Sequence, residues 1–345
     1  MVRDEAGRPA PGVALGGLVL LALVVAWVSI TTGAYPLSMD DMLSLIVRPG
    51  EADEVVRLVM VDVRLPRFVL GFLVGAVLAV SGAILQGLFR NPLADPGLIG
   101  VSAGASLAAI AVIVLGGTWL GGWVSLTGRW ALPAAAFLGG SGTVFLAWRI
   151  ARRSGETSVA TLLLAGIAIN AVAGAGTGLL TFYSSDEALR SLTFWTMGSL
   201  GHATWEDLMV AGPWLLLALF AAPFLARPLD AFLLGEPVVG HLGYHTDWVK
   251  RAAILVAGLG VGAAVAVSGL IGFVGLVVPH LVRQISGAGH RTLLPLSALL
   301  GGSLLVGADC LARVVVAPAE LPIGLMMALI GGPFFLALLI RRRII

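Results

Sequence analysis

The chain carries little charge for its length, because only 12% of its 345 residues are Asp, Glu, Lys or Arg. Hydrophobic residues make up 58%, and with the 46 glycines the apolar share is far above the ~45–50% of soluble domains. A soluble fold could not bury that much apolar surface. The formal net charge is only +2, so no broad basic surface attracts nucleic acid. Lipid is therefore the predicted environment, and nucleic acid is not a predicted partner.

Cysteine and lysine are each present only once, and their scarcity excludes two kinds of site. The single cysteine, Cys310, can form neither an intrachain disulfide nor a cysteine metal cluster, so we expect it to pack in the interior. The only lysine, Lys250, follows Val249, and the chain therefore lacks the Gly-Lys step of a phosphate-binding loop. If ATP drives this protein, a separate polypeptide has to bind it.

Ten apolar runs have about the length that crosses a membrane, where a helix rises 1.5 Å per residue through ~30 Å of hydrocarbon. We predict an all-α, polytopic membrane protein of about ten transmembrane helices, forming one domain over residues 1–345. The first run is longer than a signal-peptide core and lacks a convincing small-x-small cleavage site, so we expect it to be retained. The predicted spans are 13–30, 68–88, 98–115, 130–150, 159–182, 208–225, 249–267, 270–285, 293–316 and 324–340.

Positive charge lies unevenly on the two sides of these spans. With a cytoplasmic N-terminus, two thirds of the 21 Lys and Arg residues fall on the inner side, which is the bias seen in membrane proteins. Both termini are thus predicted to be cytoplasmic, with residues 1–12 as an N-terminal tail. The longest inner loop, 226–248, is the segment on which a soluble partner could dock. Residues 189–200 are expected to form a short helix on the outer surface.

A faint internal echo relates the two halves of the chain. Residues 80–82 read Val-Ser-Gly and precede Pro92, and residues 267–269 repeat that triplet at the same distance from Pro279. Two halves of five helices would place equivalent helices in opposite orientations, the inverted repeat of many transporters. Four matched small or apolar residues also arise by coincidence in such a composition.

Many glycines recur at helical spacing, where small residues let membrane helices approach closely. Such glycines pack helices within one subunit, or they face a second copy or a pathway; the sequence leaves both readings open. The pairs are Gly71 and Gly75, Gly174 and Gly178, and Gly258 and Gly262.

Groups that bind coupling ions are scarce in the predicted spans. The only clear carboxylate is Asp309, four residues before Arg313, and an ion pair on one helix face accounts for it. Secondary transporters usually carry more such groups, so an ion-gradient-driven transporter is only the alternative here. His241 and His245 lie one helical turn apart, but two ligands without a third make a weak metal site. No metal site is predicted.

Several ordered blocks, beginning with Arg64-Leu-Pro-Arg67, resemble the permease subunits of importers for iron siderophores, haem and cobalamin. The resemblance extends from Arg64 to the C-terminus, and this succession of blocks is far more specific than one short motif. The further blocks are residues 81–87, 90–105, 272–280, 308–313 and 320–324.

The resemblance implies the fold of a type II ABC importer permease in a bacterial inner membrane. It implies a homodimer, two cytoplasmic ATPase subunits that bind ATP and Mg²⁺, and a periplasmic binding protein that delivers an iron chelate or cobalamin. The permease itself is a transport subunit and not an enzyme, and it binds no cofactor. Residues 86–105 and 193–200 look most like those of haem-type members, which favours haem over ferric siderophore and cobalamin.

The resemblance also assigns the segment that would contact the ATPase. Within residues 226–248, short coupling helices seat apolar side chains in a groove on the ATPase, and glycines permit the turn. An ordinary connecting loop is the other reading. The assigned residues are Leu233, Leu234, Gly235, Glu236, His241, Leu242 and Gly243.

A cytoplasmic gate is implied at the junction of the fourth and fifth spans, residues 155–161. Its candidate residues are Thr157, Ser158, Val159, Ala160 and Thr161. Relatives can carry two hydroxyl residues where this chain has Val159 and Ala160, and Ser158 or its neighbours would also serve to cap the fifth helix. On the outer side, Arg190 is a candidate vestibule residue because arginine suits haem propionates. An arginine that reaches for lipid headgroups is the alternative.

Three arginines, Arg64, Arg67 and Arg313, are assigned to docking of the binding protein. They fall at the outer ends of the second and ninth spans, on the side that has fewer positive charges. The resemblance implies that they receive acidic residues of the binding protein, and exposed arginines would steer such a partner. The alternative is that Arg64 and Arg67 anchor their span while Arg313 pairs only with Asp309.

Overall fold

The computed structural model describes residues 9–33, 35, 38, 40–42, 47, 53–153 and 156–342. In this part of the chain a helix lies at each of the ten predicted spans, which confirms the all-α, polytopic fold. Seven helical segments are long and apolar enough to cross a membrane, and α5, α13 and α15 are shorter or less apolar. The ten helices are α1 (Pro11–Thr31), α4 (Leu65–Phe89), α5 (Val101–Leu115), α7 (Ala131–Ala151), α8 (Val159–Phe182), α10 (Trp205–Leu233), α12 (Thr246–Ser268), α13 (Val274–Ser286), α14 (His290–Val314) and α15 (Ile323–Arg342).

Shorter elements connect these helices. Two residues of β1 (Arg152–Arg153) pair antiparallel with β2 (Glu156–Thr157), the one departure from the all-α prediction in the described chain. The predicted surface helix is found as α9 (Asp186–Met197). The other elements are α3 (Glu54–Arg57), the π-helix η1 (Leu58–Arg64), η2 (Pro96–Ile99), α6 (Gly121–Thr127), η3 (Gly128–Trp130) and α11 (Glu236–His241).

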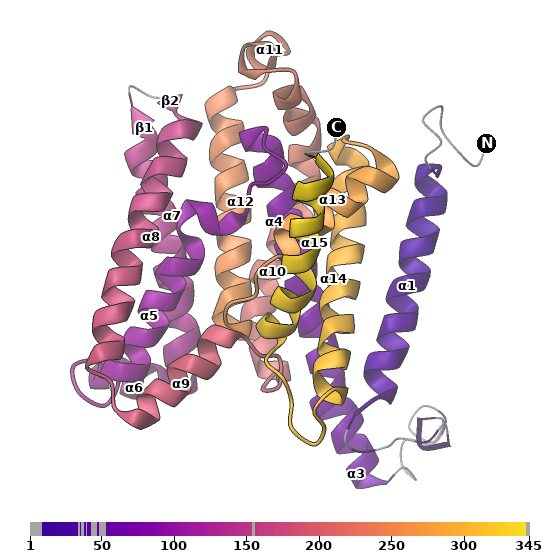
Figure 1. The fold of residues 1–345 in the computed structure, drawn as a ribbon, viewed down its shortest axis with the longest axis vertical. Coiled ribbons are helices and arrows are strands. Elements are labelled where there is room, and N and C mark those ends of the chain that lie inside the picture. The colour runs from indigo at the N-terminus through magenta and orange to yellow at the C-terminus, as the bar shows by residue number, and fades with distance from the viewer. Residues whose placement is uncertain are drawn as a thin grey trace.

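The long helices form two groups joined by α12 (Figure 1). In one group α4 is the central helix and packs against α10, α13 and α14, while α5, α7 and α8 form the other group. Helix α11 and the β1–β2 pair lie at one end of the molecule, which we call the α11 end, and α3 and α9 lie at the α9 end. Helix α1 starts, and α15 finishes, toward the α11 end. This agrees with the prediction that both termini lie on one side of the membrane. That this side is the cytoplasmic one stays a prediction.

Glycine allows the close helix crossings at the core. A Cβ atom on Gly82 of α4 would lie 1.9 Å from the carbonyl oxygen of Gly275 in α13, far inside van der Waals contact. Gly75 meets Gly301 of α14 in the same way, at 2.3 Å from its carbonyl oxygen. These approaches explain how α4, whose apolar window is 78% buried, lies inside the bundle without large side chains at the crossings.

Two predicted boundaries differ from the structure for local reasons. Helix α10 extends beyond the predicted 208–225 at both ends, because Thr204 and Asp207 form a capping box before it and it continues to Leu233 past Pro228. Helix α13 begins only at Val274, since α12 ends at Gly269 with a φ of 67°.

The sequence echo does not mark equivalent positions: residues 80–82 lie inside α4, whereas 267–269 form the end of α12. The inverted repeat stays a prediction.

Candidate functional site

Pro66 shapes the backbone that presents Arg64 and Arg67. Proline has no N–H, and its ring clashes with the carbonyl four residues earlier in a regular α-helix. Here the preceding residues 58–64 are a π-helix, and the N–H of Leu65 donates to the carbonyl of Met60, five residues back. The wider turn removes that conflict. Arg64 and Arg67 consequently emerge on successive turns and reach different neighbours.

Arg64 binds the C-terminal end of α1. Its Nη1 donates to the carbonyl oxygens of Ile30 at 2.6 Å and Thr31 at 3.0 Å, and its Nη2 donates to the carbonyl of Tyr35. The last carbonyls of a helix lack partners within it and carry its negative dipole end. The buried guanidinium of Arg64 therefore satisfies carbonyl groups that lack a hydrogen-bond partner within the helix.

Arg313 of α14 binds the same helix end from the other side. Its Nη1 donates to the carbonyls of Thr32 at 3.1 Å and Ser29 at 3.3 Å. The predicted ion pair within α14 is confirmed, with Arg313 Nε 3.2 Å from an Asp309 oxygen. Thus Arg313 links α1 to α14 and does more than pair with Asp309.

Arg67 closes a buried network with two carboxylates. Its Nε and Nη2 donate to Asp309 at 3.0 and 2.8 Å, and its Nη2 lies 2.9 Å from Glu320. Asp309 is 2% exposed, whereas the Glu320 side chain is 45% exposed. Glu320 belongs to the loop between α14 and α15, and nothing in its sequence context had pointed to this role. The carboxylate of Asp309 is thus enclosed within this network, whereas that of Glu320 is accessible to solvent.

The three arginines are brought together at the α9 end, but the expected exposure is wrong. Arg64 is 4% exposed, and Arg67 and Arg313 are each 8% exposed. The charge count placed them at the correct end of their helices and could not indicate that α1 and the carboxylates cover them. Their docking role stays a prediction.

A cavity of about 840 Å³ opens at the α9 end between α9, α7, α12 and the start of α10. Apolar and aromatic side chains, Phe194 and Trp195 among them, line much of it, and Arg129 and His202 supply polar groups. Arg190 does not line this cavity; it is exposed on α9. The arginine that does line the cavity is Arg129, which pairs with Glu206 and Asp207. The sequence reading missed Arg129 and His202 because both stand alone between spans.

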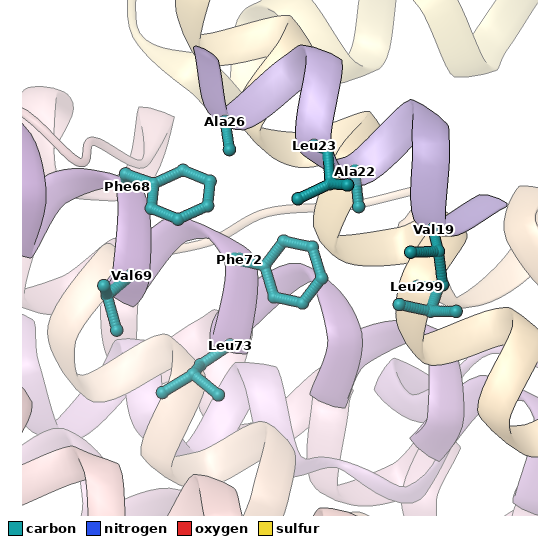
Figure 2. A pocket seen from close by; sticks show the side chains of 9 residues that line it. All are labelled: Val19, Ala22, Leu23, Ala26, Phe68, Val69, Phe72, Leu73 and Leu299. Atoms are coloured by element: carbon teal, nitrogen blue, oxygen red, sulfur yellow. The ribbon is translucent and has the colours of Figure 1, made fainter. Parts of the chain in front are cut away.

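A second cavity, of about 390 Å³, lies between α1 and α4 (Figure 2). The rings of Phe68 and Phe72 border it on the α4 side, facing Leu23 of α1. All nine lining side chains are apolar, so no group there could orient a carboxylate or a metal. Its chemistry suits hydrocarbon chains of the bilayer rather than a polar cargo.

The α11 end carries exposed leucines outside the long helices. Leu234 is 70% and Leu242 57% exposed, and both border an open groove of about 410 Å³ with Tyr244. Gly235 has a φ of 113°, a conformation that suits glycine and turns the chain from α10 into α11. His241 Nδ1 contacts the Pro237 carbonyl at 2.7 Å. The described residues contain no group of three potential metal ligands.

Helix α8 begins at the predicted gate. Ser158 is its N-cap, because the Ser158 Oγ accepts a hydrogen bond from the backbone N–H of Thr161 at 3.3 Å. The prediction that this hydroxyl caps the fifth helix is therefore confirmed. Val159 and Thr161 are half-buried and Ala160 is exposed. Residue 155 lies outside the described residues. Thr157 is 1% exposed, and whether any of these residues gates a pathway stays a prediction.

One face of α8 has no partner within the subunit. Leu164 and Val172 on this helix are 67% and 72% exposed, and a Cβ added at Gly174 or Gly178 would meet nothing within 4 Å. By contrast, Gly71 and the other predicted glycine pairs contact neighbouring helices. Packing within the subunit is therefore confirmed for those pairs, and a second copy or a pathway facing Gly174 and Gly178 stays a prediction.

The sequence pattern of the FecCD transport family matches residues 20–341. The hemin transport system permease protein HmuU of Yersinia pestis is 43% identical over 337 residues, covering 98% of each chain. The vitamin B12 import system permease protein BtuC of Klebsiella pneumoniae is 40% identical over 336 residues, 95% of this chain and 94% of the relative. The cobalamin import permease BtuC of Halobacterium salinarum is 43% identical, over 84% of this chain and 76% of the relative.

A solved structure of a metal-chelate-type ABC transporter in an inward-facing conformation has a similar fold. It superposes with a TM-score of 0.83 at 34% identity, covering 96% of this chain and 100% of that one.

Proposed function

The chain belongs to the FecCD transport family and is the permease subunit of an ATP-driven importer, and we propose that its cargo is haem. The observation that carries the proposal is the 43% identity to a hemin permease across 98% of both chains. Permeases of this kind work with an ATPase and a substrate-binding protein. Cobalamin is the second candidate, because cobalamin permeases match at 40–43% identity.

The cavity at the α9 end supports haem as cargo. Haem is a flat apolar ring with two propionates and an iron atom. Phe194 and Trp195 offer apolar area for the ring, and His202 offers an imidazole of the kind that binds haem iron. Arg129 offers donors for a propionate, in place of the predicted Arg190, which lies on the same helix as the two aromatics but away from the cavity. Arg190 is retained only as a candidate at the entrance.

We propose that two copies of the chain meet along the exposed face of α8. The face carries small residues at helical spacing, Ala171, Gly174 and Gly178 among them, beside the exposed Leu164 and Val172. In lipid, association relies on close packing of such residues rather than on the hydrophobic effect. The cargo pathway would then run between the two α8 helices, with Ser158 near its inner end.

The α11 end is proposed to bind the ATPase and the α9 end the binding protein. Exposed Leu234 and Leu242 suit an apolar groove on the ATPase. At the α9 end, Glu320 is the accessible partner of Arg67, so an acidic side chain of the binding protein can take its place. Charge reversal at Arg67 should weaken association of the binding protein and reduce its salt dependence, and an unchanged affinity across a salt series would remove this assignment.

The cargo is tested by ATP hydrolysis in a reconstituted complex of permease, ATPase and binding protein. The binding protein is added empty or loaded with haem, cobalamin or a ferric siderophore. We expect the haem-loaded form to give the largest stimulation. Stimulation by the cobalamin-loaded or siderophore-loaded form, with none by the haem-loaded form, would replace haem as the cargo and leave the importer assignment intact.

A further inference from the structure

The only lysine of the chain is buried. Lys250 lies in the second turn of α12 and is 4% exposed. A buried ammonium requires partners, because leaving water is unfavourable for its charge. Its Nζ donates to the Thr157 carbonyl oxygen at 2.8 Å and forms an ion pair with Glu236. Both requirements, charge and hydrogen bonding, are thereby met.

The two partners of Lys250 belong to different segments of the chain. Glu236 is the first residue of α11, and the exposed Leu234 and Leu242 lie just before and just after this short helix. Thr157 is the last residue of β2, directly before Ser158, the N-cap of α8. In Figure 1 the β1–β2 pair and α11 stand on either side of the end of α12. Lys250 therefore bridges the proposed ATPase contact and the proposed gate through one side chain.

Thr157 is held to α12 by a second bond. Its Oγ1 donates to Asp247 at 2.6 Å, and Asp247 is also paired with Arg251, one turn along α12. The guanidinium of Arg251 lies 5.6 Å from the ring centre of Trp148 in α7. The backbone carbonyl and the hydroxyl of Thr157 are both fixed to α12, so the start of α8 follows any displacement of that helix end.

Stability alone does not call for a charge at this position. Buried ion pairs can often be replaced by apolar side chains of similar volume without loss of stability. A methionine would fill the same space between β2 and α11. What a lysine adds is a directional link to one carboxylate and one carbonyl, and that link is useful if the two segments must move together.

We propose that Lys250 is a positioning residue that transmits movement of α11 to the start of α8. When the ATPase displaces α11, Glu236 carries Lys250 with it, and Lys250 carries Thr157 and Ser158. The proposal rests on the functions proposed above for α11 and for the start of α8. It requires no contact between Lys250 and either the cargo or the nucleotide.

The test follows the environment of a label at position 158 without any cargo. A single cysteine is introduced as Ser158→Cys in a Cys310→Ser background and labelled with a spin probe. The permease–ATPase complex is then compared with and without ATP. The variants are Lys250→Met and Glu236→Gln, and the matched control is Arg149→Met, which removes an exposed positive charge at the same end.

We expect ATP to shift the label spectrum in the parent and in Arg149→Met, and the shift to shrink about tenfold in Lys250→Met, a coupling change of ordinary size. Glu236→Gln should reduce the shift to the same extent. The double variant should reduce it no further than either single variant, because all three break the same contact between Lys250 and Glu236.

A full ATP-dependent shift in both Lys250→Met and Glu236→Gln would overturn the bridge. If Lys250→Met does not assemble, Glu236→Gln decides alone, because the side chain that it changes is 45% exposed. A parent complex in which ATP shifts nothing at position 158 would contradict the proposed gate itself. None of these results depends on which cargo is carried.

Discussion

Replacing Asp309 by asparagine should destabilise the subunit much more than removing the charge of Glu320 at the same end. Asp309 is 2% exposed and forms ion pairs with both Arg67 and Arg313. The asparagine would keep the shape but leave two buried guanidinium groups with one fewer counter-charge. Breaking a buried ion pair in this way costs about 3–5 kcal/mol. With an unfolding entropy of ~2.1 cal/mol/K per residue, that corresponds to a fall in Tm of about 4–7 °C for a chain of this length.

The matched control is Glu320→Gln, which removes the other carboxylate bound to Arg67. Its side chain is 45% exposed, and exposed pairs contribute about 0–1 kcal/mol. Thermal unfolding of the purified subunit in detergent measures both variants. Adding Arg67→Met to Asp309→Asn should recover part of the loss, because one unpaired buried charge is removed. A loss in Asp309→Asn no larger than in Glu320→Gln would refute the buried network.

Three further results are expected. Leu234→Asp combined with Gly235→Asp should abolish co-purification of the ATPase, and retained co-purification would refute the contact. Gly178→Leu should reduce homodimerisation measured by light scattering and leave the subunit folded, because a Cβ there meets nothing within 4 Å. Gly166→Leu should unfold the subunit, because its Cβ would lie 1.9 Å from the Leu98 carbonyl oxygen. Equal effects of the two variants on folding and on dimerisation would argue against the interface. A cysteine at Ser158 should crosslink to its counterpart in at least one nucleotide state, and no crosslink in any state would remove the gate.

The helices could be predicted because their information is local. An apolar run of about 20 residues is forced into a helix in lipid, where each backbone group must be satisfied within its own segment. All ten positions were found in this way. Boundaries were less accurate where polar residues sit inside a helix, as in α10, which continues past Arg227 to Leu233. The apolar run in the sequence is interrupted by such a charge, whereas the backbone hydrogen bonds of the helix continue past it.

The partners of the charged residues could not be predicted, because they come from distant parts of the chain. Arg67 meets Glu320, and Lys250 meets Thr157, across separations of 253 and 93 residues. Only the pair of Asp309 and Arg313 was visible, since four residues separate its members on one helix face. The burial of the outer arginines was missed for the same reason: no local pattern indicates that the end of α1 and the two carboxylates cover them.

Haem uptake by liposomes that contain permease and ATPase tests the central claim most directly. Loaded binding protein is supplied outside, and ATP is enclosed on the side of the ATPase. We predict that haem accumulates inside only when ATP is present, and that a proton gradient imposed without ATP gives no uptake. Accumulation under the gradient alone, or ATP-driven uptake of cobalamin without uptake of haem, would contradict the account.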